Sequence, residues 1–301
     1  MVKYIVTGGL GFIGYHLTKE LLRQGHEVII FDNLYNSEYS QVNEQKLLTE
    51  DNPNLLIINI DVLFINEASL DYDFSDVEGI FHLAAVPRVQ ASFDDVRQTN
   101  MINVDGTLSM LDFAVKNNIK RFVFASSSTA KNQLSPYGLQ KRLCEKYVNL
   151  YNDKGILGIS LRYFSVYGPN MDKTSGYALL IPKAIDCAMK GEFFNMYGDG
   201  SNMRDFTYID DVIRATITAM KFSSYGGIFD VGRGDPIKVK DVLRTVSRLT
   251  NRKMFINQLP PRVEEKITYS SDDFTELTGW KATISFDEGM NLLIESEKRN
   301  D

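Results

Sequence analysis

The chain of 301 residues is long enough to bury a large core in one two-lobed unit or in two modest domains. Its composition is ordinary for a globular protein, and a net charge of −6 without a basic run argues against nucleic acid as the main partner. The apolar runs are too short to span a bilayer, and the chain starts with a strand pattern, so we expect no membrane segment and no signal peptide. Two cysteines without a C-x-x-C pattern and three scattered histidines predict no disulfide framework and no metal site, which makes a reducing cytoplasm the expected compartment.

The first half of the chain alternates short apolar runs with longer helical patterns. The runs are continuously apolar, as is typical of parallel strands that are covered on both faces. The predicted strands are 3–7, 27–32, 55–60, 79–83, 121–125 and 158–163, and helical patterns such as 12–23 and 96–117 lie between them. This order predicts an α/β fold, a Rossmann-type doubly wound parallel sheet.

The alternation stops after residue 163. The remaining predictions are a short strand at 193–197 and helices at 180–190, 209–221, 238–249 and 286–296. We therefore expect a Rossmann-type domain over residues 1–164 and a smaller α/β lobe over 165–301. No linker separates the two, so we expect them to be interleaved, with parts such as 226–232 returning to the sheet.

A glycine turn follows the first predicted strand. Gly8, Gly11 and Gly14 form the pattern G-x-x-G-x-x-G, which allows a tight turn and a close backbone approach to a pyrophosphate at the next helix N-terminus. Taken alone, the glycines also suit an ordinary turn of an α/β protein. Asp32 ends the second strand, where a carboxylate would bind the ribose 2′-hydroxyl and repel a 2′-phosphate. Together these residues predict NAD rather than NADP.

Three polar residues of this half are open to more than one interpretation. Asp61, at the end of the third strand, is either a contact for adenine or a solvated turn acid. Asn103 lies inside a helical pattern, where it either faces the nicotinamide or is solvated. His82 lies among core residues in the segment FHLAA, and this position indicates a packed structural histidine.

Tyr137 and Lys141 are spaced i, i+4 on a predicted helix, so their side chains share one face. A nearby ammonium favours the phenolate, which makes the tyrosine a possible base near neutral pH. Alone, this pair is a weak signal that recurs by chance.

Many ordered motifs, each weak alone, together match one family. They are TGGLGFIG, FDNL, FHLAAVPRVQAS, NVDGT, FVFASSS, SPYGLQK, LRYFSVYGP, YGDGSNMRDFTYIDD and, more loosely, PRVEE with LTGW. Along its whole length the chain resembles the extended short-chain dehydrogenases/reductases of the NAD-dependent nucleotide-sugar epimerase/dehydratase family, and most of all the UDP-sugar 4-epimerases.

The resemblance implies roles for individual residues. Tyr137 is the general base, Lys141 binds the nicotinamide ribose and favours the phenolate, and Ser127 binds the sugar hydroxyl, although Ser126 and Ser128 are close in register. The implied cofactor-binding residues are Gly8, Gly11, Phe12, Ile13, Gly14, Asp32, Asn33, Asp61, Val62, Leu83, Ala84, Ala85, Asn103, Tyr137, Lys141, Tyr163 and Val166. The implied substrate-binding residues are Arg88, Ser127, Ser165, Leu180, Ile181, Tyr197, Arg204, Arg262 and Glu265.

Several substrate residues also have a simpler interpretation. Arg204, in a glycine-rich stretch, suits a diphosphate, but a surface ion pair with Asp205 or Asp210 is the alternative. Tyr197 is either a stacking partner for a base such as uracil or a core aromatic residue. Arg262 and Glu265 resemble the family's Arg-x-x-Asp pair, with glutamate in place of aspartate.

The chain departs from the family at two places. Only nine residues separate Ser127 from Tyr137, which is a shorter loop than in relatives, and Ser165 stands where asparagine is common. No Asp or Glu lies between Ser127 and Tyr137, although dehydratases and the related decarboxylases need an acid there.

We therefore expect NAD-dependent C4 epimerisation of a UDP-hexose, UDP-N-acetylhexosamine or UDP-uronate through a 4-keto intermediate. A nucleotide-sugar 4-oxidoreductase and a catalytically degenerate binding protein are the alternatives. The helical patterns 96–117 and 136–152 correspond to those that build the family's homodimer, so a homodimer is expected.

Overall fold

The computed structural model describes residues 1–35, 37–87, 89–172, 180–222, 224–261 and 270–300. The chain forms two compact units. Unit 1 comprises Met1–Arg162 and Ile213–Phe229, and unit 2 comprises Tyr163–Val212 and Asp230–Asp301. Within the described residues, no helix combines the length and the apolar character that a membrane crossing requires.

A seven-stranded sheet forms the framework of the dinucleotide-binding fold. Its strand order is β3-β2-β1-β4-β5-β6, with β11 beside β6. The pairs β1–β2, β1–β4, β2–β3 and β4–β5 are parallel. The order 3-2-1-4-5-6 is that of a Rossmann fold, so the predicted fold class is confirmed. The strands are β1 (Lys3–Thr7), β2 (Glu27–Asp32), β3 (Leu55–Asn59), β4 (Val77–His82), β5 (Arg121–Ser127), β6 (Leu157–Tyr163) and β11 (Gly227–Val231).

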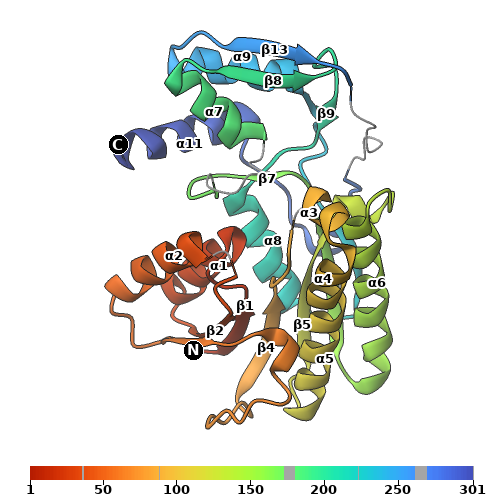
Figure 1. Cartoon of the computed structure of the whole chain (residues 1–301). Helices are drawn as coiled ribbons and strands as arrows, with labels where there is room; N and C mark the ends of the chain where they lie inside the picture. The colour runs from red at the N-terminus through yellow and green to blue at the C-terminus, as the bar shows by residue number, and fades with distance from the viewer. Residues whose placement is uncertain (36, 88, 173–179, 223, 262–269, 301) are drawn as a thin grey trace. The chain divides into compact units, whose positions relative to one another are not determined.

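Helices cover both faces of this sheet in unit 1 (Figure 1). Helices α1 (Phe12–Arg23) and α2 (Ser37–Thr49) lie on one face, and α4 (Val96–Asn100), α5 (Gly106–Lys116) and α6 (Pro136–Leu150) lie on the other. The sheet residues Phe31, Phe122 and Phe124 are fully buried in one cluster with residues of α5. Each such side chain contributes roughly 1.5–3 kcal/mol through its burial, so this core holds the strand ends in place.

Helix α6 has a strong start signal. Ser135 is its N-cap and accepts a hydrogen bond from the amide of Gly138 at 3.1 Å, and Pro136 occupies the first turn. Its buried face carries Tyr137, Lys141 and Glu145 beside apolar residues. Burial of polar and charged side chains such as these costs free energy unless they are paired, so this face indicates a functional role.

Short sheets and helices make up unit 2. Its strands pair as β7 (Val166–Tyr167) with β10 (Thr207–Tyr208), β9 (Met203–Arg204) with β12 (Ile237–Lys238), and β8 (Phe193–Tyr197) with β13 (Phe255–Leu259). Its helices are α7 (Leu180–Lys190), α9 (Val239–Thr250), α10 (Asp273–Thr278) and α11 (Phe286–Asn300), and α8 (Ile209–Lys221) starts in unit 2 and continues into unit 1.

Most predicted elements agree with the structure. Helices α1, α7 and α8 and strand β8 have the predicted bounds. Several other ends differ by one to four residues, as is common for helix and strand ends. The helix predicted over 96–117 is wrong as one regular helix, because a π-helix over Met101–Asp105 separates α4 from α5. Helices α2 and α3 (Val89–Asp94), helix α10 and strand β13 were not predicted.

Candidate active site

The glycine turn lies at the carboxyl end of β1, as the sequence predicted. Gly8 has a φ of +66°, which favours glycine, and its amide donates to the carbonyl of Phe31 at 2.8 Å. A Cβ on Gly14 would overlap the carbonyl oxygen of Gly8. Gly11 is the N-cap of α1 and has no side chain to fill the space before the helix. The turn therefore leaves a bare helix N-terminus, which fits a pyrophosphate.

Phe12 and Ile13 form the first residues of α1 and are half-buried. They lie directly after the bare turn, where a bound dinucleotide would meet their backbone amides. Their cofactor role remains a prediction.

Asp32 lies at the end of β2, next to this turn. Its carboxylate accepts hydrogen bonds from the amides of Leu10 at 3.1 Å and Leu34 at 2.9 Å, which fix its orientation. Burial raises the pKa of Asp32, and these two amide bonds act against that rise. A carboxylate oriented by the glycine loop is well placed for a ribose diol, and its charge would oppose a 2′-phosphate.

Asn33 and Asp61 join the ends of β2 and β3. The Asn33 amide donates to Asp61 at 2.9 Å. Asp61 also accepts from the amide of Leu63 at 2.9 Å and so caps the short 3₁₀ turn over Val62–Phe64. Val62 is buried by this turn. The pair lies at the edge of the sheet beside Asp32. A direct contact of Asp61 with adenine remains a prediction.

His82 is part of a buried network at the end of β4. Its ring lies 2.7 Å from the Thr7 hydroxyl and 3.1 Å from the Thr107 hydroxyl. Burial, with Lys141 as a second cause, lowers the pKa of His82 to about 3. The ring is therefore neutral, and the predicted structural histidine is confirmed. Thr7 also accepts from the amides of Leu83 and Ala84 at 3.1 Å each.

The backbone after β4 lies close to the glycine turn. A Cβ on Gly8 would lie 2.8 Å from the backbone nitrogen of Ala84. Leu83, Ala84 and Ala85 are half-buried. Their small or flexible side chains leave space at this edge of the sheet. A cofactor on the glycine turn would meet this segment, as the resemblance implies.

The solvated alternative for Asn103 is wrong, because the residue is buried in the π-helix. Its amide oxygen accepts from the amide of Val86 at 2.8 Å, and its amide nitrogen donates to Gln140 on α6 at 2.9 Å. Asn103 therefore ties the loop after β4 to the helix that carries Tyr137. The wider π turn accommodates this inward side chain, and such turns are frequent at functional sites.

Tyr137, Lys141 and Ser127 come together where β5 ends and α6 begins. The Lys141 ammonium donates to the carbonyl of Ala125 at 2.8 Å and lies 5.8 Å from the centre of the Tyr137 ring. Ser127 is half-buried and accepts hydrogen bonds from the Thr129 hydroxyl at 2.9 Å and the Thr129 amide at 3.3 Å. With both bonds accepted by its oxygen, the hydroxyl hydrogen of Ser127 is free to point toward a substrate oxygen.

The Lys141 side chain is buried. Besides its bond to Ala125, its ammonium lies 4.7 Å from the centre of the Phe124 ring, a cation–π distance. Burial lowers the pKa of Lys141 to about 8, while Cys144 and Glu145 act to raise it. The lysine is thus charged at neutral pH and loses its proton just above it.

Ser92 and Glu145 make further polar contacts of α6. Ser92 on α3 accepts the backbone amide of Tyr137 at 3.0 Å. Glu145 is completely buried and binds Ser126 together with Arg142 and Arg162. The sequence reasoning did not select these residues, although the spacing of Tyr137, Lys141 and Glu145 by four residues placed all three on one helix face.

The predicted residues around residue 165 lie in unit 2. Tyr163 is buried, and Val166 starts β7 and pairs with Thr207 of β10. Ser165 has a φ of +27°, in the left-handed region that asparagine tolerates better than serine. This backbone conformation gives a physical reason for the asparagine that relatives commonly have there.

The other predicted substrate residues of unit 2 lie at the ends of its elements. Leu180 and Ile181 start α7, Tyr197 ends β8 and is half-buried, and Arg204 ends β9 and is exposed. Asp205 binds the amides of Arg233 and Gly234 at 3.0 Å each and the Ser270 hydroxyl at 2.9 Å. The predicted residues Arg88, Arg262 and Glu265 lie outside the described residues.

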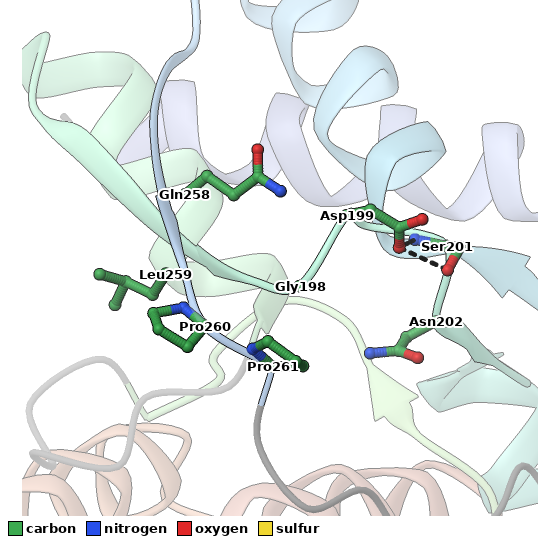
Figure 2. A pocket seen from close by; sticks show the side chains of 8 residues that line it. All are labelled: Gly198, Asp199, Ser201, Asn202, Gln258, Leu259, Pro260 and Pro261. Atoms are coloured by element: carbon green, nitrogen blue, oxygen red, sulfur yellow. Dashed lines mark hydrogen bonds between the residues drawn. The ribbon is translucent and has the colours of Figure 1, made fainter.

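The residues that directly follow Tyr197 in sequence line part of an open hollow of about 640 Å³ (Figure 2). The turn after β8 forms one wall, where Asp199 accepts hydrogen bonds from the amide and hydroxyl of Ser201. The end of β13 and the two prolines after it form the other wall. The lining residues are Gly198, Asp199, Ser201, Asn202, Gln258, Leu259, Pro260 and Pro261. None of the candidate catalytic residues is among them.

A bare glycine turn, an oriented carboxylate after β2 and a buried Tyr–Lys pair define a Rossmann-type protein of the dinucleotide-dependent class. The chain belongs to the NAD dependent epimerase/dehydratase family, whose profile matches residues 4–232.

Similar proteins cover the chain from end to end. A putative UDP-glucose 4-epimerase of Methanocaldococcus jannaschii is 33% identical, over 98% of this chain and 98% of that protein. A UDP-N-acetyl-alpha-D-glucosaminuronate decarboxylase of Bacillus cytotoxicus is 31% identical, over 97% of each. The structure of UDP-glucuronic acid 4-epimerase from Bacillus cereus in complex with UDP-glucuronic acid and NAD matches with a TM-score of 0.88 at 26% identity, over 100% of each chain.

Proposed function

We propose that this protein is an NAD-dependent 4-epimerase of a UDP-activated sugar. The observation that carries the proposal is the cluster at the end of β5, where buried Lys141 lies beside Tyr137 and Ser127 offers a hydroxyl hydrogen. No Asp or Glu accompanies this cluster between residues 127 and 137. The similarity to 4-epimerases over the full length supports the same reaction.

Each residue of the cluster has a distinct task in this proposal. The Tyr137 oxygen takes the proton of the sugar C4 hydroxyl and returns it after the ring has presented its other face. Ser127 donates its hydrogen bond to that hydroxyl oxygen and orients it. Lys141 supplies a positive charge in a dry environment, where it favours the phenolate more strongly than it would in water.

The residues of the glycine turn and Asp32 fit NAD. The bare N-terminus of α1 would bind the pyrophosphate, and the Asp32 carboxylate would bind the adenosine ribose. When bound, NAD supplies reversible hydride acceptance at C4. The reaction then has no net redox change, so the protein does not need a second reductant or oxidant.

Unit 2 is assigned the nucleotide part of the substrate. Arg204 is an exposed guanidinium at the end of β9, and such a group suits the oxygens of a diphosphate. Tyr197 is half-buried, which leaves part of its ring available to stack on uracil. The similarity to UDP-sugar enzymes favours uridine over other bases.

The similarity to a UDP-N-acetyl-glucosaminuronate decarboxylase suggests one competing reaction. Ser128 and Thr129 stand beside Ser127, and neither can act as the acid that this chemistry is expected to need. A 4-oxidoreductase and a binding protein without turnover are the other outcomes that an assay must separate.

Product analysis tests the proposal. The protein is incubated separately with UDP-glucose, UDP-N-acetylglucosamine and UDP-glucuronate, and the products are separated by chromatography and identified by proton NMR. We expect a C4 epimer of at least one substrate, no lasting rise in absorbance at 340 nm and no loss of carbon dioxide. A lasting accumulation of NADH identifies an oxidoreductase, and a UDP-pentose product identifies a decarboxylase. If the protein with bound NAD converts none of the substrates, catalysis is contradicted.

We further propose a homodimer through α4, the π-helix and α6. Val96, Met101, Leu139 and Leu150 are large apolar residues that unit 1 leaves exposed. Leu139→Glu should convert the dimer to a monomer in light scattering coupled to size exclusion. Leu48→Glu on α2 is the matched control, since Leu48 is 58% exposed and Leu139 is 56% exposed. A wild-type monomer at micromolar concentration contradicts this assignment.

A further inference from the structure

Glu145 is a completely buried carboxylate with an unusual number of partners. Its oxygens accept bonds from the Ser126 hydroxyl at 2.6 Å, from Arg142 at 2.9 Å and from Arg162 at 2.7 and 2.8 Å. The bond to Arg162 is bidentate, the strongest geometry for such a pair. These contacts connect α6, β5 and β6 at one point inside unit 1.

The contacts of Glu145 lie directly beside the candidate catalytic residues. Ser126 precedes Ser127 at the end of β5, and Lys141 lies one helical turn before Glu145 on α6. Lys141 binds the Ala125 carbonyl, and Glu145 binds the Ser126 side chain. Two successive residues of β5 are therefore fixed to α6 immediately before the chain presents Ser127.

Glu145 also contributes the negative charge that this buried region needs. Glu145 forms ion pairs with Arg142 of α6 and Arg162 of β6, and it acts to raise the pKa of Lys141. Burial favours the neutral form of two other titratable groups near Lys141. Burial raises the pKa of the Cys144 thiol, and it lowers the pKa of His82 on β4 to about 3. Strand β5 contributes the Phe124 ring and the Ala125 carbonyl to the surroundings of the Lys141 ammonium.

Without Glu145, the buried Lys141 ammonium would lose this nearby negative charge, while the partly buried guanidinium groups of Arg142 and Arg162 would remain. A buried cation beside like charges loses its proton more easily. Lys141 already has its pKa lowered to about 8 by burial, with Glu145 among the groups that raise it. Removal of the carboxylate would thus bring the loss of the Lys141 proton into the neutral range.

We propose that Glu145 is a positioning residue for the epimerisation: it fixes the end of β5 that presents Ser127, and it keeps Lys141 protonated. This inference rests on the proposed function. The proposed role of Glu145 differs from that of a purely structural ion pair in one measurable consequence. Loss of a structural pair changes stability but does not shift the pH dependence of turnover.

Two variants separate the two tasks of Glu145. Glu145→Gln keeps the shape of the side chain and removes its charge. We expect kcat to fall by about tenfold to 100-fold, as for small displacements of catalytic groups, with little change in KM. We also expect the alkaline limb of the kcat profile to move down by about one pH unit. Ser126→Ala removes only the contact to β5, so kcat should fall while the alkaline limb stays in place.

A control variant breaks a more exposed ion pair at the other end of β5. Glu78 of β4 lies 3.0 Å from the guanidinium of Arg121, the first residue of β5, and the Glu78 side chain is 50% exposed. Glu78→Gln should leave kcat and the pH profile unchanged. If Glu145→Gln does not fold, Ser126→Ala still decides, because wild-type kcat in that variant overturns the proposed positioning.

A direct titration of Lys141 makes the outcome independent of turnover. Protein with ¹⁵N-labelled lysine is titrated by NMR in its NAD-bound form, and the Lys141 signal is assigned by its loss in Lys141→Arg. A lower titration midpoint of Lys141 in Glu145→Gln than in wild type supports the proposal, even if the protein converts no sugar. Failure of the proposed function is seen separately, as a wild-type protein without epimerase activity. An unchanged midpoint together with an unchanged pH profile overturns it.

Discussion

The buried charge of Lys141 should make this region less stable than a version without it. The side chain is enclosed, and burial lowers its pKa from 10.5 to about 8 in the folded state. In the unfolded chain the lysine is expected to keep its ordinary pKa. Below about pH 8 both states carry the proton, and the folded state bears the full penalty for a buried charge.

The size of this penalty follows from the shift. Each pKa unit corresponds to about 1.4 kcal/mol, so the penalty is about 3 kcal/mol at pH 7. Between pH 8 and 10.5 only the unfolded state holds the proton, and stability therefore rises with pH through this window. Lys141→Met removes the charge but also the bond to the Ala125 carbonyl, a loss of about 1 kcal/mol. The net expectation is a gain of about 2 kcal/mol at pH 7.

Urea unfolding of cofactor-free protein at pH 7 and pH 10 checks this expectation. Lys141→Met should be more stable than wild type at pH 7, and the difference should shrink by about 2.5 kcal/mol at pH 10. The same variant should have no epimerase activity. Lys146→Met, on the exposed side of α6, is the control and should change stability by less than about 0.5 kcal/mol at either pH. A destabilised Lys141→Met at pH 7, with a difference that does not depend on pH, would refute the reasoning.

Four further substitutions test the sites individually. Gly14→Ala places a Cβ against the Gly8 carbonyl, so we expect a loss of about 1–3 kcal/mol and of NAD binding, measured by unfolding and by released nucleotide. Gly11→Ala, whose Cβ would lie 3.2 Å from the same oxygen, should be milder, and equal losses would contradict the geometry. Asp32→Asn should weaken NAD binding by about tenfold and reduce the preference over NADP in calorimetric titrations, whereas an unchanged preference rules out its role at the ribose. Ser165→Asn suits the left-handed backbone and should raise stability by up to about 1 kcal/mol, and a loss of stability speaks against strain at this position.

The parts of the fold that were predicted from sequence are those with local signals. Strand β1, the glycine turn and α1 follow each other within one segment, and apolar periodicity fixes the bounds of α7 and α8. Helix α2 was missed because its face is only weakly apolar, and its sequence SEYSQVNEQKLLT is rich in polar residues. Strand β13 was missed because its pairing partner, β8, lies about sixty residues earlier in the chain.

The site shows the same division. Asp32 was selected by its place after the glycine turn and the second strand, whereas the Tyr137–Lys141 pair is weak alone and was selected by the ordered motifs along the whole chain. The contacts of Asn103 with Val86 and Gln140 depend on a π turn that no local propensity predicts. Glu145 was missed because its partner Arg162 lies on β6, and only the folded sheet brings the two together.

The most direct test of the central claim is conversion of a UDP-sugar by wild type and by Tyr137→Phe, side by side. The account predicts that wild type, with NAD bound, produces the C4 epimer from either direction with no lasting change at 340 nm. It predicts that Tyr137→Phe, folded and with the same NAD content, produces none. Equal conversion by both proteins, or no conversion of any tested UDP-sugar by NAD-loaded wild type, would contradict it.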